Sequence, residues 1–252
     1  MRAIPIPIPI AVAVLAAGSV SVCQAETSGG GSLQLTQDYI SKGLSLTCRD
    51  PAGQVDLHVR HTGSSASATE FGGVWGSAGL GRSDCGSSRE VDLYAGGSWL
   101  IAPSSNLTLT YVRYSFPGGS YYIPSLAGRR YDYDEFDVLW TFRDRLSFSL
   151  SWTPDALTRG YRVPESDRNA LSYGIVARQP LGFEITLSAS AGYDRILDPA
   201  GTGYGFWSIG LNRTWDRVQL DLVFFRASPR AVRIFGEEVA GPRLVASVSW
   251  RF

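Results

Sequence analysis

The chain has 252 residues, with 23 basic and 23 acidic side chains and a formal net charge of zero. This length suits one domain or at most two, and the balanced charge excludes a strongly basic nucleic-acid binder and a long acidic tail. Charged residues make up only 18% of the chain, whereas glycine (28), tyrosine (12) and tryptophan (7) are plentiful. This composition predicts a protein built mostly of β-structure.

Residues 1–25 have the features of a secretory signal peptide that is cleaved after export. Arg2 supplies the positive charge, residues 10–17 form an apolar run, and Cys23-Gln24-Ala25 provides the small residues of a cleavage site. A membrane anchor is one alternative, but prolines interrupt the apolar run and the remainder is too short to span a bilayer. Lipid attachment at Cys23 is another alternative, which the large side chain of Val22 before it disfavours.

Two cysteines, Cys48 and Cys85, remain in the mature chain. In an oxidising compartment they are expected to form one disulfide, with two free thiols as the alternative. They lack the C-x-x-C spacing of a metal site, and the sequence predicts no metal and no cofactor. Residues 26–31, which include Gly29-Gly30-Gly31, are expected to be a flexible lead-in rather than a phosphate loop, because no helix follows them.

From residue 32 onward, apolar and polar residues alternate with the period of two that is typical of β-strands. The clearest example is 146–152, where Leu146, Phe148, Leu150 and Trp152 alternate with three serines. The pattern predicts twelve strands, at 33–41, 54–61, 71–80, 90–99, 107–115, 133–142, 146–152, 170–178, 185–193, 204–213, 218–224 and 244–252. Short turns mostly alternate with longer polar connections, as in an up-and-down antiparallel sheet. The exception is the 62–69 connection, which is longer than a tight turn.

Three features favour a membrane barrel over a soluble sandwich. The last strand runs to Phe252, aromatic residues gather near the predicted strand ends, and the polar faces consist mostly of Ser, Thr and Gly. Aromatic girdles at two membrane interfaces produce such a distribution, and lipid requires the sheet to close. We therefore predict an all-β protein over residues 32–252: a single closed antiparallel up-and-down transmembrane β-barrel of about twelve strands, in the bacterial outer membrane.

Several ordered stretches resemble one family, the TorF-type porins, also called the Gcw_chp family. They include Leu35-Thr36-Gln37-Asp38-Tyr39 with Lys42-Gly43, then Tyr131-Asp132-Tyr133-Asp134-Glu135-Phe136, and the ending Ser247-Val248-Ser249-Trp250-Arg251-Phe252. The resemblance implies an outer-membrane barrel with a channel role and no catalytic residues. The sequence departs from the family by having Lys42 where arginine is usual, and by its two cysteines. The terminal strand, with Trp250 and Phe252, resembles the signal read by the barrel assembly machinery.

The strand phase also predicts which charged residues face the barrel interior. These pore-lining candidates are Asp56, His58, Arg60, Glu90, Asp92, Asp137, Arg178, Glu184, Asp194, Asp221 and Arg251. Seven of them are acids and three are arginines, an excess that favours cations unless the charges pair with one another. An outer-membrane hydrolase needs a histidine beside a nucleophile or activated water, and neither His58 nor His61 has such a context in the sequence.

The sequence therefore predicts a non-enzymatic outer-membrane porin, a passive channel for small hydrophilic solutes or ions with a weak preference for cations. The alternative is a receptor, adhesin or structural barrel that acts through its long loops, and a hydrolase is a third. Expected partners are membrane lipid, lipopolysaccharide phosphates contacted by loop arginines, the barrel assembly machinery and small solutes, with no nucleic acid.

Overall fold

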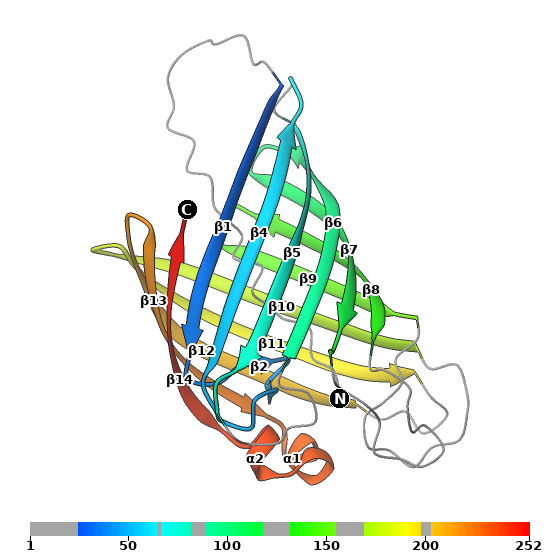
Figure 1. Ribbon diagram of the computed structural model, residues 1–252, viewed down its shortest axis with the longest axis vertical. Coiled ribbons are helices and arrows are strands. Elements are labelled where there is room, and N and C mark those ends of the chain that lie inside the picture. The colour runs from blue at the N-terminus through cyan, green and yellow to red at the C-terminus, as the bar shows by residue number, and fades with distance from the viewer. Residues whose placement is uncertain (1–24, 65–66, 82–88, 118–131, 155–168, 198–202) are drawn as a thin grey trace.

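The computed structural model describes residues 25–64, 67–81, 89–117, 132–154, 169–197 and 203–252. In this part of the chain the elements are, in order, β1 (Glu26–Thr36), β2 (Ile40–Ser41), β3 (Leu44–Ser45), β4 (Ala52–Thr62), β5 (Ala68–Gly79), β6 (Arg89–Ala102), β7 (Ser105–Ser115), β8 (Tyr133–Phe142), β9 (Leu146–Thr153), β10 (Asn169–Gly182), β11 (Ile185–Leu197), β12 (Gly203–Trp215), β13 (Val218–Ala227), α1 (Pro229–Phe235), α2 (Glu237–Ala240) and β14 (Arg243–Arg251). The fold is thus almost entirely β-structure (Figure 1).

Twelve of these strands form one closed antiparallel barrel, in the order β1-β14-β13-β12-β11-β10-β9-β8-β7-β6-β5-β4. Closure takes place at β1, where Leu33 lies opposite Trp250 of β14 on one side and opposite Val55 of β4 on the other. A bilayer offers no water to an open strand edge, so closure satisfies every strand's backbone. The predicted up-and-down transmembrane barrel of twelve strands is confirmed.

The alternation in the sequence separates the outer and inner faces of the wall. In β9, Phe148, Leu150 and Trp152 are 43–44% exposed on the outer face, whereas Ser147 and Ser151 at the alternate positions are buried on the inner face. The same outward apolar positions recur around the barrel, among them Leu33, Leu57, Leu93, Leu109, Val138, Ile175, Ile209, Leu222 and Val248. This apolar surface is the one that a β-barrel presents to lipid.

Aromatic side chains lie on the outer face toward both ends of the barrel. Phe136 stacks on Trp152 with ring centroids 5.6 Å apart, and Tyr173 stacks on Tyr193 at 5.8 Å, toward the end with the long connections. Toward the opposite end Trp250 contacts Phe252 at 4.9 Å. Aromatic rings with a polar edge suit the boundary between hydrocarbon and water, so these groups mark the two membrane interfaces.

The two ends of the barrel differ in their connections. Tight turns join β6 to β7, β8 to β9, β10 to β11 and β12 to β13, and their residues with positive φ include Ser104 (63°), Asp144 (54°) and Asp216 (49°). Turns of this hand match the twist of the paired strands. The opposite end carries the longer connections, and the one from β13 to β14 contains α1 and α2 (Figure 1). Within the described residues no helix is long and apolar enough to cross a membrane.

Two expectations about the start of the barrel are wrong. Residues 26–31 are not a flexible lead-in: they form the first half of β1 and pair with β4 from Glu26 opposite Thr62 onward. The three glycines allow this tight packing, since a Cβ at Gly31 would lie 2.6 Å from the carbonyl oxygen of Asp56. The strand predicted at 33–41 ends instead at Thr36, where the chain leaves the wall.

An arginine on the outer face should destabilise the barrel. Leu150→Arg should lower the free energy of unfolding by about 2–4 kcal/mol, because it puts a charge into the middle of the lipid-facing surface. Ser149→Arg is the matched control, since it adds the same charge to the inner face of the same strand, and it should stay close to wild type. Denaturant unfolding in lipid vesicles measures both, and equal losses would contradict the assigned faces.

Candidate functional site: a hairpin inside the barrel

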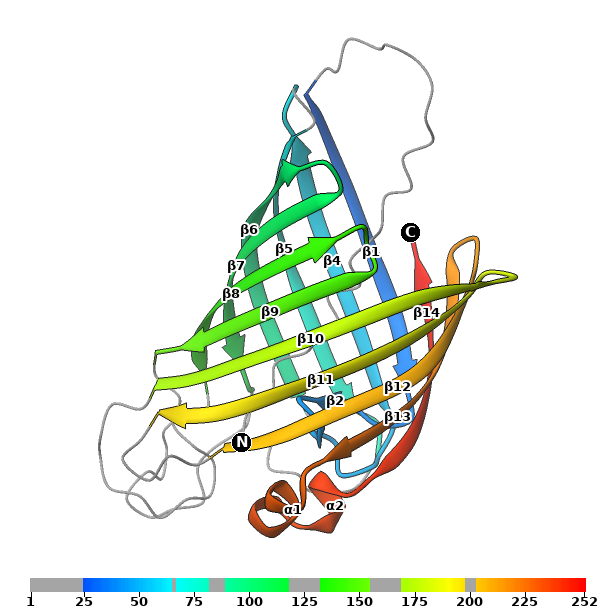
Figure 2. The ribbon, with the colours of Figure 1, turned by 180° about the vertical axis from the view of Figure 1, so that it is seen from behind.

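The connection between β1 and β4 folds back into the barrel as a hairpin. Residues 37–51, here called the plug hairpin, contain β2 and β3, which pair with Ile40 opposite Ser45 and Ser41 opposite Leu44. Its turn is Lys42-Gly43, with φ of 46° and 77°, both in the left-handed region that two-residue hairpins favour. Figures 1 and 2, seen from opposite sides, both place β2 inside the wall at the end that carries α1 and α2.

Residues 38–47 of the plug hairpin are almost entirely buried against the barrel wall and the two helices. Ser41 and Leu44 are each 1% exposed, a value typical of a protein core rather than of a loop. Leu44 packs in an apolar cluster with Tyr204, Phe206 and Ala227 of the wall and Ala231 and Ala240 of the helices. Gly43 approaches Phe206 so closely that an added Cβ would lie 2.6 Å from its Cβ, and its positive φ also requires glycine.

A second apolar cluster holds the other side of the hairpin. Tyr39 and Leu46 pack with Ala52 and Trp75, and the rings of Tyr39 and Trp75 lie 5.5 Å apart. Burial raises the pKa of the Tyr39 hydroxyl well above its ordinary value, and the nearby acids Glu90 and Asp92 raise it further. Tyr39 is therefore a neutral phenol at physiological pH.

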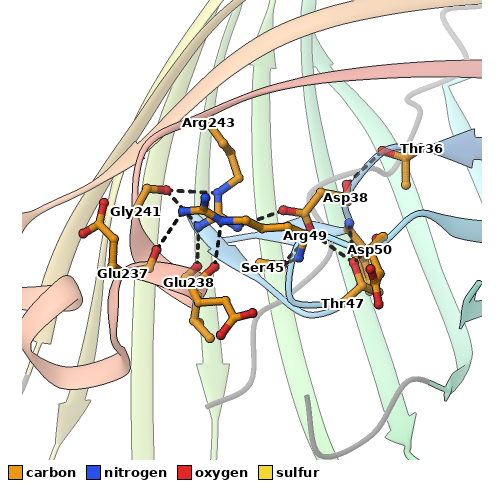
Figure 3. A network of polar contacts seen from close by, with 12 residues as sticks. Thr36, Asp38, Ser45, Thr47, Arg49, Asp50, Glu237, Glu238, Gly241 and Arg243 are labelled. Atoms are coloured by element: carbon orange, nitrogen blue, oxygen red, sulfur yellow. Dashed lines mark hydrogen bonds and ion pairs between the residues drawn. The ribbon is translucent and has the colours of Figure 1, made fainter. Parts of the chain in front are cut away.

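A buried ion pair anchors the base of the hairpin to the last strand (Figure 3). Asp38 accepts hydrogen bonds from Ser45 Oγ (2.5 Å) and Thr47 Oγ1 (3.0 Å) within the hairpin, and from Arg243 Nη1 of β14 at 2.8 Å. Arg243 also donates to the carbonyl oxygens of Gly241 and Val239. One guanidinium thus joins the hairpin, β14 and the end of α2.

A second arginine extends this anchor toward the helices. Arg49 donates to the carbonyl oxygens of Glu237 at 3.0 Å and Glu238 at 3.3 Å (Figure 3). These contacts are exposed, so they contribute less to stability than the buried pair of Asp38 and Arg243. They nevertheless fix where the returning arm of the hairpin leaves the barrel.

The tip of the hairpin reaches acids on two separated wall strands. Lys42 Nζ lies 3.7 Å from Glu135 Oε2 on β8 and 3.7 Å from Asp194 Oδ1 on β11, and all three side chains are at least nine-tenths buried. Glu135 also accepts a hydrogen bond from Thr153 Oγ1 at 2.8 Å. Because β8 and β11 are separated by two other strands in the wall, the lysine links distant parts of the barrel across its interior.

The lysine tip faces an acidic inner wall. We call the five residues Glu90, Asp92, Glu135, Asp137 and Asp194 the acidic belt; they lie on β6, β8 and β11, and four of them are at most 6% exposed. Four were among the predicted pore-lining residues, and Glu135 was missed although it shares the phase of Asp137. No group of three His, Cys, Asp or Glu side chains within the described ranges is placed to hold a metal ion.

The remaining predicted pore-lining residues lie farther from the hairpin. Asp56, Arg60, Arg178, Asp221 and Arg251 are on the inner face, mostly half-buried. Most are hydrogen-bonded to neighbouring polar side chains rather than to opposite charges. Gln219, for instance, accepts from Arg251 Nη2 at 2.6 Å and donates to Asp221 at 2.7 Å.

Glu184 is the one candidate whose predicted direction is wrong. It is exposed in the turn between β10 and β11, where Gly182, Phe183 and Glu184 all have positive φ. Such a turn interrupts the two-residue alternation from which its inward direction was predicted. Glu184 therefore contributes no charge to the interior near the hairpin.

His58 is held by an inner-face acid rather than standing alone. Its Nδ1 lies 2.5 Å from Asp56 Oδ1, and the other oxygen of Asp56 accepts a hydrogen bond from Tyr94 at 2.6 Å. Tyr94 in turn packs against the aromatic clusters around the hairpin. His61, expected near a strand end, is exposed and contacts Thr27 Oγ1 at 2.9 Å.

The described site thus belongs to a closed transmembrane β-barrel whose interior is occupied at one end by its own first connection. The chain is a member of the Gcw_chp family, described as bacterial proteins of unknown function, whose model matches residues 24–227. None of the curated proteins matches the sequence. The family description does not carry the TorF-type name or a porin activity, so both remain proposals.

Several solved structures are similar to this chain at low sequence identity. A membrane protein from work on in-meso crystallisation is 14% identical with a TM-score of 0.57, over 89% of this chain and 83% of that one. The KdgM porin is 10% identical with a TM-score of 0.48, over 88% and 99% of the two chains. An outer membrane channel from Pseudomonas putida F1 is 14% identical with a TM-score of 0.45, over 93% and 97%.

Loss of the buried pair at the base should release the plug hairpin. Lys42 is the only lysine, so a lysine-specific protease can report on the hairpin alone. Arg243→Met leaves Asp38 buried without its partner, at a cost of about 3–5 kcal/mol, and should speed cleavage after Lys42 by about 100-fold or more. Arg233→Met, on the exposed face of α1, is the control and should cleave at the wild-type rate.

The predicted disulfide joins the plug hairpin to the connection after β5. Cys48 lies in the hairpin, whereas Cys85 lies outside the described residues, so the bridge stays a prediction. Proteolysis of the exported protein without reductant should give one linked peptide pair containing both cysteines, which reductant separates. Recovery of two alkylated free cysteines without reductant would contradict it.

Proposed function

We propose that this protein is an outer-membrane channel for small hydrophilic solutes or ions, exported by its signal peptide, with the plug hairpin as its constriction. The observation that carries the proposal is the contrast between the two halves of the interior. Around the hairpin the inner face is aromatic and buried, with Tyr114, Tyr133 and Tyr204 at most 3% exposed. Toward the tight turns it is polar and partly exposed, as at Ser188 and Ser208.

The small residues of the second half support a water-filled interior. Ser190 Oγ and Ser208 Oγ lie 2.7 Å apart on neighbouring strands, and the same face continues through Ser247 and Ser249 of β14. Side chains can fill a barrel of eight strands, whereas twelve strands enclose a wider section. Serines and glycines are too small to fill it, so water is the natural occupant of this half.

The acids of the inner face support a preference for cations. The five carboxyl groups of the acidic belt face one ammonium, that of Lys42. Farther along the wall, Asp56 and Asp221 stand against Arg60, Arg178 and Arg251, so the inner face keeps a modest excess of acids. Rings of acidic groups in a pore raise the local concentration of cations, an effect that salt screens. The preference is therefore expected to be weak and largest at low ionic strength.

The pair of His58 and Asp56 is the observation that favours a hydrolase, because an acid that orients a histidine is part of many hydrolytic sites. Its third contact is the hydroxyl of Tyr94, which donates to Asp56 rather than approaching the free side of the imidazole. The pair is therefore better explained as a wall contact that positions Tyr94 beneath the hairpin. A non-enzymatic role is the one we propose.

The proposal of an outer-membrane barrel also sets which partners we expect. Lipid covers the apolar outer face, and the terminal strand with Trp250 and Phe252 serves the barrel assembly machinery. Of the loop arginines expected to meet lipopolysaccharide phosphates, Arg230 and Arg233 are exposed on α1. Arg129, Arg130, Arg159, Arg162 and Arg168 lie outside the described residues.

Removal of two acidic-belt charges tests the channel and its selectivity together. Asp92→Asn with Asp137→Asn should reduce the cation preference, seen as a reversal potential closer to zero in a salt gradient at low ionic strength. Asp216→Asn, in the exposed β12–β13 turn, is the matched control and should behave as wild type. Planar-bilayer recordings measure the wild-type protein, the double variant and the control. The channel proposal would be contradicted if the barrel gave no conductance steps even after its plug hairpin had been removed.

A further inference from the structure

The ammonium of Lys42 occupies a site that the barrel wall builds independently of the hairpin. Glu135 and Asp194 stand on β8 and β11, so strands of the barrel wall rather than the hairpin carry them. Three acids of this wall have a tyrosine beside them. Asp92 pairs in register with Tyr114, Asp194 pairs with Tyr204, and Tyr133 stands two residues before Glu135 on the same face. Carboxyl groups beside aromatic rings are the surroundings that an organic ammonium group prefers.

Lys42 fills this site incompletely. Its two distances of 3.7 Å exceed the 2.7–2.9 Å of a charge-assisted hydrogen bond by almost an ångström. Glu135 Oε1 and Asp92 Oδ1 are buried without a hydrogen-bond donor among the described residues, because the side chains nearest to them, Asp137 and Glu90, are themselves acids. Buried polar oxygens are normally satisfied, so these point to a ligand with more donors than one lysine at this distance supplies.

We propose that the wall around Glu135 and Asp194 is a binding site for small organic cations with a primary ammonium group, and that Lys42 is a built-in competitor for it. A diamine arriving from the lumen takes the place of the Lys42 ammonium, and the tip of the plug hairpin withdraws. The inference rests on the proposed function in that the displaced tip opens the channel. The cation site itself depends only on the wall.

At Glu135 and Asp194 one ammonium group of the diamine replaces that of Lys42, and the other acids of the acidic belt face its second ammonium group, so no charge is left buried alone. What opposes it is the apolar packing of Leu44 against Phe206 and Tyr204, which holds the hairpin in place when no ligand is present. The base of the hairpin, anchored through Asp38 and Arg243, need not move. The expected motion is thus confined to the tip around Lys42-Gly43.

Cleavage after the single lysine tests the site without any channel measurement. In wild-type protein, 1,4-diaminobutane should raise the rate of cleavage by a lysine-specific protease about tenfold, since it increases the population with Lys42 withdrawn. The neutral isostere 1,4-butanediol should leave the rate unchanged. Glu135→Gln with Asp194→Asn should cleave rapidly with or without the diamine. The unfolded chain should be cleaved at one rate in all solutions, which controls for effects on the protease.

Conductance measurements then test whether withdrawal of Lys42 opens the channel. Lys42→Met should raise the open probability about tenfold over wild type and make it insensitive to 1,4-diaminobutane, whereas Lys42→Arg should stay closed, because a guanidinium binds two carboxylates more firmly. Migration of the unheated folded barrel in a denaturing gel shows that each variant is folded. Equal cleavage rates in diamine and diol overturn the cation site, and a Lys42→Met barrel that opens no more than wild type overturns the gate.

A further variant distinguishes these failures from failure of the channel. Replacement of residues 38–47 by a glycine-serine linker removes the plug hairpin from the barrel. If this barrel does not conduct, the channel proposal is wrong, while diamine-dependent cleavage of the wild-type protein still establishes the site. If it conducts and the Lys42 variants behave as wild type, the channel stands and the gate is wrong.

Discussion

The need to satisfy every backbone hydrogen bond inside a bilayer determines the rest of this structure. Hydrocarbon offers neither hydrogen-bond donors nor acceptors, so the first and last strands must pair with each other and close the sheet. Closure draws residues as early as Glu26 into β1, where they pair with β4 along their whole length. It also creates an interior that no lipid reaches. Polar and charged side chains that point inward are therefore compatible with a membrane protein, provided that they meet water or one another.

The interior meets that condition in two different ways. Toward the tight turns, small side chains leave the charged groups half-exposed, and hydrogen bonds such as that from Arg251 to Gln219 suffice. Toward the long connections, the plug hairpin and aromatic clusters exclude water, and a buried charge there costs several kcal/mol unless it is paired. Asp38 and Lys42, at the base and the tip of the hairpin, each meet an opposite charge on the wall. These ion pairs thus fix where the hairpin can lie.

The sequence predicts the wall of this barrel well and its plug poorly, for a physical reason. Which face a strand residue occupies depends on a local period of two, so Leu150, Asp92 and Asp221 were assigned correctly from their neighbours alone. The prediction fails where local geometry changes: at Glu184 in a turn with positive φ, and at residues 37–41, which were predicted to continue the first strand although the chain leaves the wall after Thr36. The contact that fixes the hairpin joins Asp38 to Arg243, 205 residues later, and no local pattern encodes it.

The identity of the basic residue at the tip of the plug hairpin affects how firmly the hairpin is held inside the barrel. Lys42 is the only lysine among 23 basic residues, and it stands where the chain meets two buried acids. An arginine there would offer a planar fork able to bind both carboxyl groups through several hydrogen bonds, as Arg243 does with Asp38 and two carbonyl oxygens. An ammonium is a compact charge with no such preferred plane, and at 3.7 Å it is attracted without being hydrogen-bonded. The base of the plug hairpin is thus held by directed hydrogen bonds, whereas its tip is held by undirected charge attraction and the apolar packing of Leu44, so the tip is the part that a competing cation can displace.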